Sequence, residues 1–323
     1  MDLGNKRIVV TGGAGFLGRH VCRELAHTGC SQVLVPRSSD YDLRRRDDVE
    51  RMFQDLAPEI VIHMAAAVGG IGANREQPGP FFYENLIMGA EVLERARLHG
   101  LEKFVGVGTV CAYPRLTPVP FREEDLWNGY PEETNAPYGL AKKMLLVQGQ
   151  AYREQYGFNA IHVLPTNVYG PGDSHDLERS HVIPALILKC LAAQRSGADS
   201  IEVWGSGEAS RDFLYVEDCA RAIVEATRSW DQVDPVNIGT GRETTIRELV
   251  DLVSRLCGFE GDVVWNTSKP DGQPRRCLDV SRAREGFGFE ATVRLEEGLR
   301  ETIDWYRTSL GAHIRPDAAA SGG

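Results

Sequence analysis

Short apolar runs that alternate with longer amphipathic stretches constrain the fold of this chain more than any other feature. The runs are rich in Val and Ile, as in "RIVVT", "EIVIHMA" and "KFVGVG". Parallel strands joined by helical crossovers have this pattern, because such strands are buried on both faces of the sheet. The sequence therefore predicts an α/β fold with a doubly wound parallel sheet. The predicted strands are 7–11, 32–36, 59–65, 103–108 and 159–165, and the predicted helices are 16–28, 46–56, 80–99 and 138–157.

The alternation becomes less regular after about residue 170. There the loop "YGPGDSHDLERS" leads into a helix that we expect Ser180 to cap, with His181 in the first turn. Later helices are predicted at 217–228, 244–257 and about 295–308. These patterns predict a nucleotide-binding domain at 1–170 to which about 206–240 return, a smaller C-terminal α/β substrate domain mainly within 171–312, and a disordered tail at 313–323.

Charge and apolar content exclude several classes of protein. The formal net charge is −10 and the sequence pI is about 5.4, whereas a nucleic-acid-binding surface needs clustered Lys and Arg. The first residues lack the apolar run of a signal peptide, and no stretch approaches the roughly 18 apolar residues of a membrane span. The seven cysteines are scattered without a C-x-x-C pair, which favours reduced thiols over disulfides or a metal site. We therefore expect a cytoplasmic protein without nucleic-acid, membrane or metal partners.

The segment "TGGAGFLG" at 11–18 is the strongest indication of a ligand. It follows the first predicted strand and opens the first helix, which places Gly12, Gly15 and Gly18 in a G-x-x-G-x-x-G pattern. Glycines allow a tight turn and a close approach to a pyrophosphate, and the helix N-terminus offers N–H donors to the anion. The alternative is a purely structural turn. We interpret the segment as the dinucleotide site of a Rossmann-type domain, with further cofactor contacts at Phe16, Leu17, Asp42, Leu43, Ala65 and Ala66.

The end of the second predicted strand discriminates between the two nicotinamide cofactors. NAD-dependent Rossmann enzymes tend to place an acidic residue there to bind the ribose 2′-hydroxyl. This chain reads "VPRSS", with Arg37 followed by two serines, and a guanidinium beside hydroxyls suits a 2′-phosphate. We therefore expect NADP (NADPH) rather than NAD. The alternative is that Arg37 is a solvated surface residue.

Tyr138 and Lys142 in "NAPYGLAKK" indicate redox chemistry at a carbonyl. Four residues apart on a helix, they share one face, and the ammonium is expected to lower the pKa of the phenol, which would exchange a proton with a sugar hydroxyl or ketone. Upstream, "VGTVCAYP" carries Thr109 at a strand end and Cys111 two residues later. On an extended chain both side chains lie on the same side, which places a thiol beside the hydroxyl. Taken alone, Cys111 is more often a small buried apolar residue, and His181 an exposed helix-start residue.

Together these residues resemble the extended short-chain dehydrogenase/reductase superfamily, and most closely the GDP-L-fucose synthase family of GDP-4-keto-6-deoxymannose 3,5-epimerase/4-reductases. The resemblance covers nearly the whole chain and includes "AAAVGGI", "LPTNVYGP", "SHVIPAL", "RDFLYVED" and "SKPDGQPRR". It implies an NADPH-dependent oxidoreductase with isomerase activity. It also implies a homodimer in which the helices at 80–99 and 138–157 of two copies pair as a four-helix bundle.

Position by position, the resemblance implies Thr109, Tyr138 and Lys142 as the reductase triad, and Cys111 and His181 as the acid/base pair of epimerisation. Two positions depart from the family: it usually has Ser at position 109, which keeps the hydroxyl, and more often Arg at position 189. The residues implied around the cofactor are Pro165, Asn167, Val168 and His181, and those implied around the nucleotide-sugar are Asn167, Val182, Lys189, Trp204, Arg211 and Lys269.

The chemistry of a 4-keto sugar agrees with these roles. A ketone at carbon 4 acidifies the hydrogens on carbons 3 and 5, and inverting either centre requires two groups, one to remove a proton and one to return it to the other face. We therefore expect an NADPH-dependent 3,5-epimerase/4-reductase of a GDP-4-keto-6-deoxyhexose, which forms GDP-L-fucose or a close relative. The alternatives are a nucleotide-sugar epimerase without net reduction, similar to GDP-mannose 3,5-epimerase or a 4-epimerase, and a non-catalytic dinucleotide-binding sensor.

The variant Arg37→Ala tests the expected cofactor preference. If Arg37 binds the 2′-phosphate, its removal weakens NADPH binding by about 1.5–3 kcal/mol, the cost of a lost charge-assisted contact, and leaves NADH binding nearly unchanged. Fluorescence titrations with the two cofactors measure both dissociation constants. Equal losses for NADPH and NADH would contradict the assignment.

Overall fold

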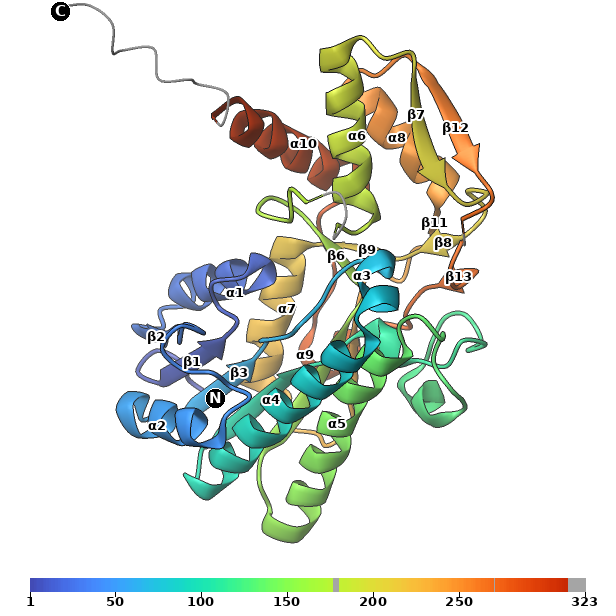
Figure 1. The fold of residues 1–323 in the computed structure, drawn as a ribbon. Helices are drawn as coiled ribbons and strands as arrows, with labels where there is room; N and C mark the ends of the chain where they lie inside the picture. Colours follow the sequence, from blue (N-terminus) through green and yellow to red (C-terminus); the bar gives the residue numbers. More distant parts are fainter. Residues whose placement is uncertain (177–179, 270, 313–323) are drawn as a thin grey trace, which may run out of the picture.

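A six-stranded parallel sheet is the central element of the structure (Figure 1). The computed structural model describes residues 1–176, 180–269 and 271–312, so the predicted tail at 313–323 lies outside the described residues. The strand order is β2–β1–β3–β4–β5–β10, and every neighbouring pair is parallel. This topology confirms the α/β class and the doubly wound sheet. The strands are β1 (Arg7–Thr11), β2 (Gln32–Leu34), β3 (Ile60–His63), β4 (Lys103–Val107), β5 (Ala160–Pro165) and β10 (Val236–Ile238).

Helices cover both faces of this sheet, and alternate strand residues meet them. On β1, Ile8 and Val10 belong to the apolar cluster of one face, whereas Val9 belongs to the cluster of the other face. Burial on both sides explains why the strands are continuous apolar runs in the sequence. The helices of the first face are α1 (Phe16–His27) and α7 (Val216–Ser229), and those of the second are α2 (Arg46–Leu56), α4 (Pro78–Leu98) and α5 (Ala136–Tyr156).

The predicted bounds of α1, α2, α4 and α5 differ from the observed ones by at most two residues. Apolar residues at helical spacing account for this agreement in α1 and α2, and α4 and α5 each have a proline in the first turn, where helices tolerate it. Among all the helices of the described ranges, none is both long and apolar enough to cross a membrane.

The helices that carry a second apolar core lie beyond the central sheet (Figure 1). It includes Leu186, Leu249 and Ile303, one from each of three helices. The domain boundaries given above stay a prediction. The helices are α6 (Val182–Ser196), α8 (Ile246–Cys257) and α10 (Leu295–Ala312). Two pairs of short strands are formed by β6 (Asn167–Tyr169) with β9 (Phe213–Tyr215) and by β7 (Ser200–Trp204) with β12 (Asp262–Asn266). A small sheet consists of β11 (Thr244–Thr245), β8 (Ser210–Arg211) and β13 (Arg275–Arg276).

The last part of the chain contributes to the first core as well. α9 (Ser281–Phe287) packs on β10 and α7, and Ala283 and Phe289 belong to the same apolar cluster as Ile8. This helix was not predicted from the sequence, because seven residues with four charged or glycine positions carry too short an apolar pattern. The short α3 (Ile71–Glu76) was missed for the same reason.

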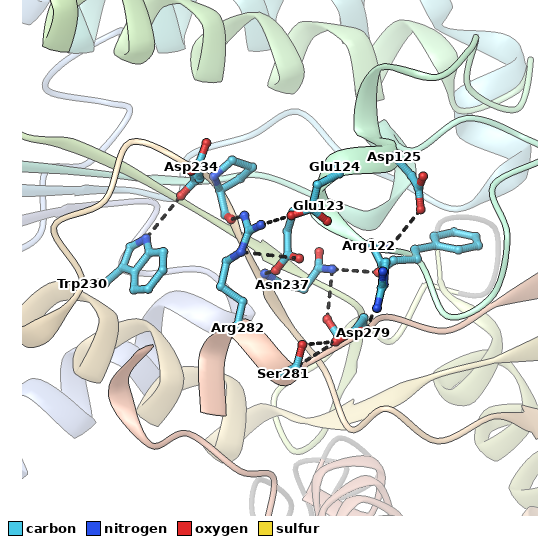
Figure 2. A network of polar contacts seen from close by, with 12 residues as sticks. Arg122, Glu123, Glu124, Asp125, Trp230, Asp234, Asn237, Asp279, Ser281 and Arg282 are labelled. Carbon is cyan, nitrogen blue, oxygen red and sulfur yellow. Dashed lines mark hydrogen bonds and ion pairs between the residues drawn. The ribbon is translucent and has the colours of Figure 1, made fainter. Parts of the chain in front are cut away.

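A buried polar network joins three segments at the β10 edge of the central sheet, as Figure 2 shows. The side-chain nitrogen of Asn237 donates to the carbonyls of Phe121 and Asp279 at 3.0 and 3.1 Å, and its backbone N–H donates to Glu123 at 2.9 Å. The side-chain oxygen accepts a hydrogen bond from the Tyr113 hydroxyl at 2.7 Å. Both ends of this fully buried amide are therefore paired, which fixes the loop after β4 against the segment before α9.

Asp218, at the start of α7, joins α7 to the segment that precedes α10. Its carboxylate is buried and accepts hydrogen bonds from the backbone N–H groups of Thr292 and Val293, each at 2.9 Å. The Thr292 hydroxyl donates to it at 2.9 Å and the Arg221 guanidinium at 2.6 Å. A single side chain thus satisfies two backbone donors and one cation.

Asp218→Ala is expected to lower the free energy of unfolding by about 2–4 kcal/mol, because it leaves these donors unpaired and partly buried. Urea unfolding should show a lower midpoint at an unchanged m-value. Asp251 on α8 is exposed, so Asp251→Ala is the matched control, with an expected change within about 0.5 kcal/mol. Similar midpoints for the two variants would show that Asp218 does not join these segments.

Candidate active site

The turn between β1 and α1 has the geometry expected of a dinucleotide-binding loop. Gly12 has a φ of +73°, and a Cβ there would lie 2.8 Å from the Ala65 nitrogen. A Cβ on Gly18 would lie 2.1 Å from the Gly12 carbonyl oxygen, so α1 packs directly against the turn. Gly15 is the N-cap of α1, and no side chain caps the first N–H groups of the helix. This backbone cradle, which any larger residue would fill, fits a pyrophosphate.

The other predicted cofactor positions lie after the strands of the central sheet or in the first turn of α1. Ala65 follows β3, and its N–H donates to Thr11 Oγ1 at 3.3 Å. Three of the predicted side chains also pack against apolar clusters, which gives them a structural role in addition to the predicted one. Leu17 and Val168 pack against the cluster of β1 and α7, and Leu43 packs against the cluster of α2 and α4. Of the other predicted positions, Phe16 and Ala66 are half-buried, and Pro165 is buried at the end of β5.

Arg37 and Asp42 lie beyond the end of β2. Arg37 is exposed, a position compatible both with a 2′-phosphate ligand and with a solvated surface residue. The Asp42 carboxylate is held by Arg44, which donates from Nε and Nη2 at 2.8 Å each and lowers the pKa of Asp42. Arg44 also pairs with Glu84 at 3.1 Å. Their cofactor roles stay predictions.

The turn after β4 corrects the expectation that Thr109 and Cys111 lie on one face of a strand. β4 ends at Val107, and Val110–Ala112 form one turn of 3₁₀-helix. Thr109 Oγ1 accepts a hydrogen bond from the Cys111 N–H at 3.2 Å. The hydroxyl therefore caps the turn and bends a segment that a continuing strand would keep extended. The two side chains are neighbours because of this turn rather than because of strand periodicity.

Tyr138, in the first turn of α5, lies beside both of these residues. Burial raises the pKa of its phenol and so does the neighbouring Cys111, whereas a hydrogen bond with the Thr109 hydroxyl opposes the shift. The expectation that Lys142 lowers this pKa is therefore wrong for this structure, in which burial dominates. A phenol that keeps its proton is suited to donate it to an oxyanion.

Lys142 lies one turn further along α5 and is almost fully buried. Burial lowers the pKa of its ammonium to about 8. Nζ donates to the Ala65 carbonyl at 3.5 Å, a long hydrogen bond for a charged donor. Below it, the buried His63 ring is 2.9 Å from Thr11 Oγ1, and both burial and Lys142 lower the pKa of His63, so this imidazole is neutral.

Arg276 on β13 is a functional candidate that the sequence analysis missed. Its Nη1 lies 3.6 Å from Cys111 Sγ, and its Nε donates to Gln273 Oε1 at 3.1 Å. Arg276 also pairs in register with Arg211 on β8, and burial together with Arg276 lowers the pKa of Arg211. Asp271 and Glu132 partly oppose this shift, and two neighbouring buried guanidiniums form a site that an anion would stabilise. The second Arg of "SKPDGQPRR" was the signal available in the sequence.

His181 does not lie in the first turn of α6, as expected, but is its N-cap residue. The Ser180 hydroxyl donates to the Asp176 carbonyl at 2.5 Å instead of capping the helix. The His181 side chain is exposed. Burial raises the pKa of Asp173, whereas the Ser174 backbone N–H and the charges of His181 and His175 oppose this shift. Within the described residues, no contact joins His181 to Cys111.

Two predicted substrate residues form an exposed pair at the end of β7. Trp204 is 48% exposed, and Lys269 Nζ lies 4.9 Å from the centroid of its ring. An exposed indole with a cation above it offers a planar face on which a purine or pyrimidine base can stack. The prediction of a nucleotide-sugar site at this position is compatible with the pair but is not tested by it.

The remaining predicted substrate residues make internal contacts. Lys189 Nζ donates to the Glu202 carbonyl at 2.7 Å, and burial lowers the pKa of Lys189. Asn167 Nδ2 donates to the Asp212 carbonyl at 2.8 Å. Val182 packs against the second apolar core. Across the described ranges, no group of three or more His, Cys, Asp or Glu side chains is arranged to hold a metal ion.

Comparisons with known proteins agree with this geometry. The profile of the NAD dependent epimerase/dehydratase family matches residues 8–239. A GDP-L-fucose synthase from Sinorhizobium fredii is 43% identical over 95% of this chain and 98% of its own length. A GDP-6-OMe-4-keto-L-xylo-heptose reductase from C. jejuni superposes with a TM-score of 0.89 at 27% identity, over 95% of this chain and 99% of the other. A GDP-L-fucose synthetase from Naegleria fowleri with bound NADP superposes with a TM-score of 0.85 at 30% identity, over 94% of each chain.

Proposed function

Because this chain belongs to the NAD dependent epimerase/dehydratase family, we propose that it is an NADPH-dependent 3,5-epimerase/4-reductase of a GDP-4-keto-6-deoxyhexose, which forms GDP-L-fucose or a close relative. The observation that carries the proposal is a thiol placed beside a proton-bearing phenol and a guanidinium, in Cys111, Tyr138 and Arg276. Reduction of a ketone uses the phenol but has no use for a thiol. The names of the S. fredii and C. jejuni proteins support a GDP-sugar as substrate.

The epimerisation half of the reaction needs an acid and a base on opposite faces of the sugar. Cys111 is half-buried at the 3₁₀ turn and belongs to the nucleotide-binding side, whereas His181 is at the N-terminus of α6 and belongs to the second core region. A sugar bound between these elements would meet the thiol on one face and the imidazole on the other. Thiol and imidazole groups both act as general acids and bases in enzymes, which suits reversible proton transfer.

The reduction half needs a proton for the oxygen on carbon 4. Tyr138 keeps its proton because burial raises the pKa of the phenol, and Thr109 holds the phenolic oxygen by a hydrogen bond. During epimerisation, the same two hydroxyl groups would stabilise the enolate oxygen. Bound NADPH supplies the hydride, and the residues that fit it are the glycines of the first turn, with Lys142 for the nicotinamide ribose.

The charge at the site favours an anionic substrate. Arg211 and Arg276 lie side by side on neighbouring strands. A diphosphate bound between them would offset the unfavourable energy of two buried like charges. The exposed pair Trp204 and Lys269 would then hold the nucleobase at the end of β7. Neither contact involves the sugar. These residues therefore support a nucleotide-sugar as substrate but do not identify its sugar.

The second candidate is a nucleotide-sugar epimerase without net reduction. A UDP-glucose 4-epimerase from Thermotoga maritima supports this candidate, because it superposes with a TM-score of 0.83 at 29% identity over 94% of this chain and 99% of its own. Consumption of NADPH separates the two candidates: the epimerase/reductase oxidises one NADPH per product, whereas the epimerase regenerates its cofactor.

Cys111→Ser is expected to separate the two half-reactions. It should lower solvent deuterium incorporation at carbons 3 and 5 of GDP-4-keto-6-deoxymannose by at least about 100-fold, because a serine hydroxyl is too weak an acid for this proton transfer. NADPH oxidation should persist and yield an unepimerised 6-deoxy sugar. Tyr138→Phe should instead slow hydride transfer most. Mass spectrometry and NADPH absorbance measure the two activities.

Cys22 on α1 is half-buried like Cys111, so Cys22→Ser is the matched control and should keep both activities. Deuterium exchange at the native rate in Cys111→Ser would show that this thiol only packs. Absence of NADPH oxidation by the unaltered protein with GDP- and UDP-4-keto sugars would remove the proposed reductase function.

We also propose that the protein is a cytoplasmic homodimer that pairs α4 and α5 of two copies. The two helices lie side by side (Figure 1) and expose large apolar side chains. Phe82 and Tyr83 on α4 are 40% and 61% exposed, and Met144 and Val147 on α5 are 36% and 40% exposed. Apolar area of this kind on paired helices favours a self-complementary four-helix contact.

Val147→Glu is expected to convert the dimer to a monomer, because it places one charge per copy in an apolar contact. Val264 on β12 is 51% exposed and far from these helices in the chain, so Val264→Glu should leave the mass unchanged. Light scattering at micromolar concentration measures the mass of each protein. A monomeric unaltered protein would refute the dimer.

A further inference from the structure

His162 on β5 is a buried side chain that the proposed mechanism does not use. It is 2% exposed, and within the described residues neither of its ring nitrogens has a hydrogen-bond partner. The Leu145 carbonyl of α5 lies near the ring but does not complete a hydrogen bond. An imidazole has one N–H donor and one acceptor nitrogen, and leaving both unpaired in a protein interior is costly, so a histidine kept here calls for a partner.

The chain makes space for this ring on two sides. A Cβ on Gly106 of β4 would lie 2.6 Å from the His162 ring carbon Cδ2, and a Cβ on Gly149 of α5 would lie 2.5 Å from Cε1. Two glycines therefore cradle the imidazole between the sheet and α5. The ring is held in a defined position and is not free to reach another polar group.

A small cavity separates His162 from the catalytic side chains. It has about 10 Å³ of space for the centre of a water molecule, which is close to the minimum that one water needs. The residues with polar side chains that line it are Thr109, Lys142, Lys143 and His162, although most of its wall is formed by apolar atoms, as at Leu146 and Leu164. The cavity thus lies directly behind two members of the proposed reductase triad.

Two of the polar walls are already engaged. Lys143 donates to the Leu126 carbonyl and lies 4.2 Å from the centroid of the Trp127 ring. The Thr109 hydroxyl accepts from the Cys111 N–H. Lys142, in contrast, has a single long hydrogen bond at 3.5 Å although an ammonium has three donors. Lys142 and His162 are therefore the two walls with hydrogen-bonding capacity to spare.

We propose that this cavity binds one water molecule, which accepts a hydrogen bond from Lys142 Nζ and donates one to a ring nitrogen of His162, and that His162 is a positioning residue for the reductase. The water would hold the Lys142 ammonium on the side that faces His162, so that its other N–H donors stay available for the cofactor. It also stabilises the charged form of Lys142, because a neutral imidazole accepts through the water and adds no charge.

The titratable groups around Lys142 make the direction of the effect definite. His63 from β3 and His162 from β5 face it, Tyr138 lies on its own helix, and Cys111 lies in the turn after β4. Burial lowers the pKa of Lys142 to about 8. Burial, together with the charge of Lys142, lowers the pKa of His162 to about 3, so His162 is neutral at working pH. The bridge would raise the pKa of Lys142 above the value that burial alone sets, so a variant without the bridge loses the charge on Lys142 at a lower pH.

The test compares His162→Phe, which removes the ring nitrogens, with His162→Gln, which keeps a polar side chain. The Lys142 Nζ titration, followed by ¹⁵N NMR, should move to lower pH by about one unit in His162→Phe, a tenfold change in proton affinity, and largely recover in His162→Gln. The alkaline limb of NADPH oxidation should move with it. Phe104→Leu perturbs the same sheet face, 6.5 Å from the His162 ring, without lining the cavity, and should leave both in place.

A crystal structure of the unaltered protein decides the inference even if His162→Phe fails to fold. A water molecule within hydrogen-bond distance of both Lys142 Nζ and His162 supports it, and a dry cavity overturns it. An unchanged Lys142 titration in a folded His162→Phe overturns it as well. The role in reduction rests on the proposed function, but the water and the NMR titration do not, so failure of NADPH oxidation would refute only the proposed function.

Discussion

The buried amide of Asn237 is the interaction on which the geometry of the site depends. On one side it holds the hydroxyl of Tyr113, two residues after Cys111, and on the other it holds the carbonyl of Asp279, three residues after Arg276. The thiol and the guanidinium that meet at 3.6 Å are thus anchored by the same side chain, although 165 positions separate them in the sequence. Since each unpaired group of a buried amide costs about 1–3 kcal/mol, this junction forms completely or not at all.

Burial acts on the members of the site in a consistent way. It raises the pKa of Tyr138 and lowers that of Lys142, and in both cases it favours the uncharged form. The phenol can therefore give up its proton only to a group that develops negative charge. Burial also lowers the pKa of Arg211, to about 9, but this guanidinium still carries its charge at neutral pH. The result is a weakly solvated region with positive charge at one end, which matches a substrate that carries a diphosphate at one end and a ketone at the other.

Much of the fold and part of the site could be predicted from local sequence. The strands and helices of the central sheet follow from apolar periodicity, and the glycine turn follows from the steric needs of Gly12 and Gly18. Three features could not be predicted in this way. The bend at Thr109 depends on one side-chain hydrogen bond that competes with strand geometry, the pKa of Tyr138 depends on burial that spacing does not reveal, and Arg276 reaches Cys111 only because distant strands β8 and β13 pair. Each of these depends on contacts between residues far apart in the chain or on competition between local structures.

The return of the chain to its first core has a consequence for synthesis on the ribosome. β5 ends at Pro165, but its neighbour β10 begins at Val236, and the Asp279 carbonyl that completes the Asn237 junction is translated later still. At roughly 5–20 residues per second, the hydrogen-bonding edge of β5 stays uncovered for several seconds in each nascent chain. An open strand edge is a template for pairing with other nascent chains on the same message. The sheet is therefore complete only after translation has passed β10, about seventy residues after β5 ends.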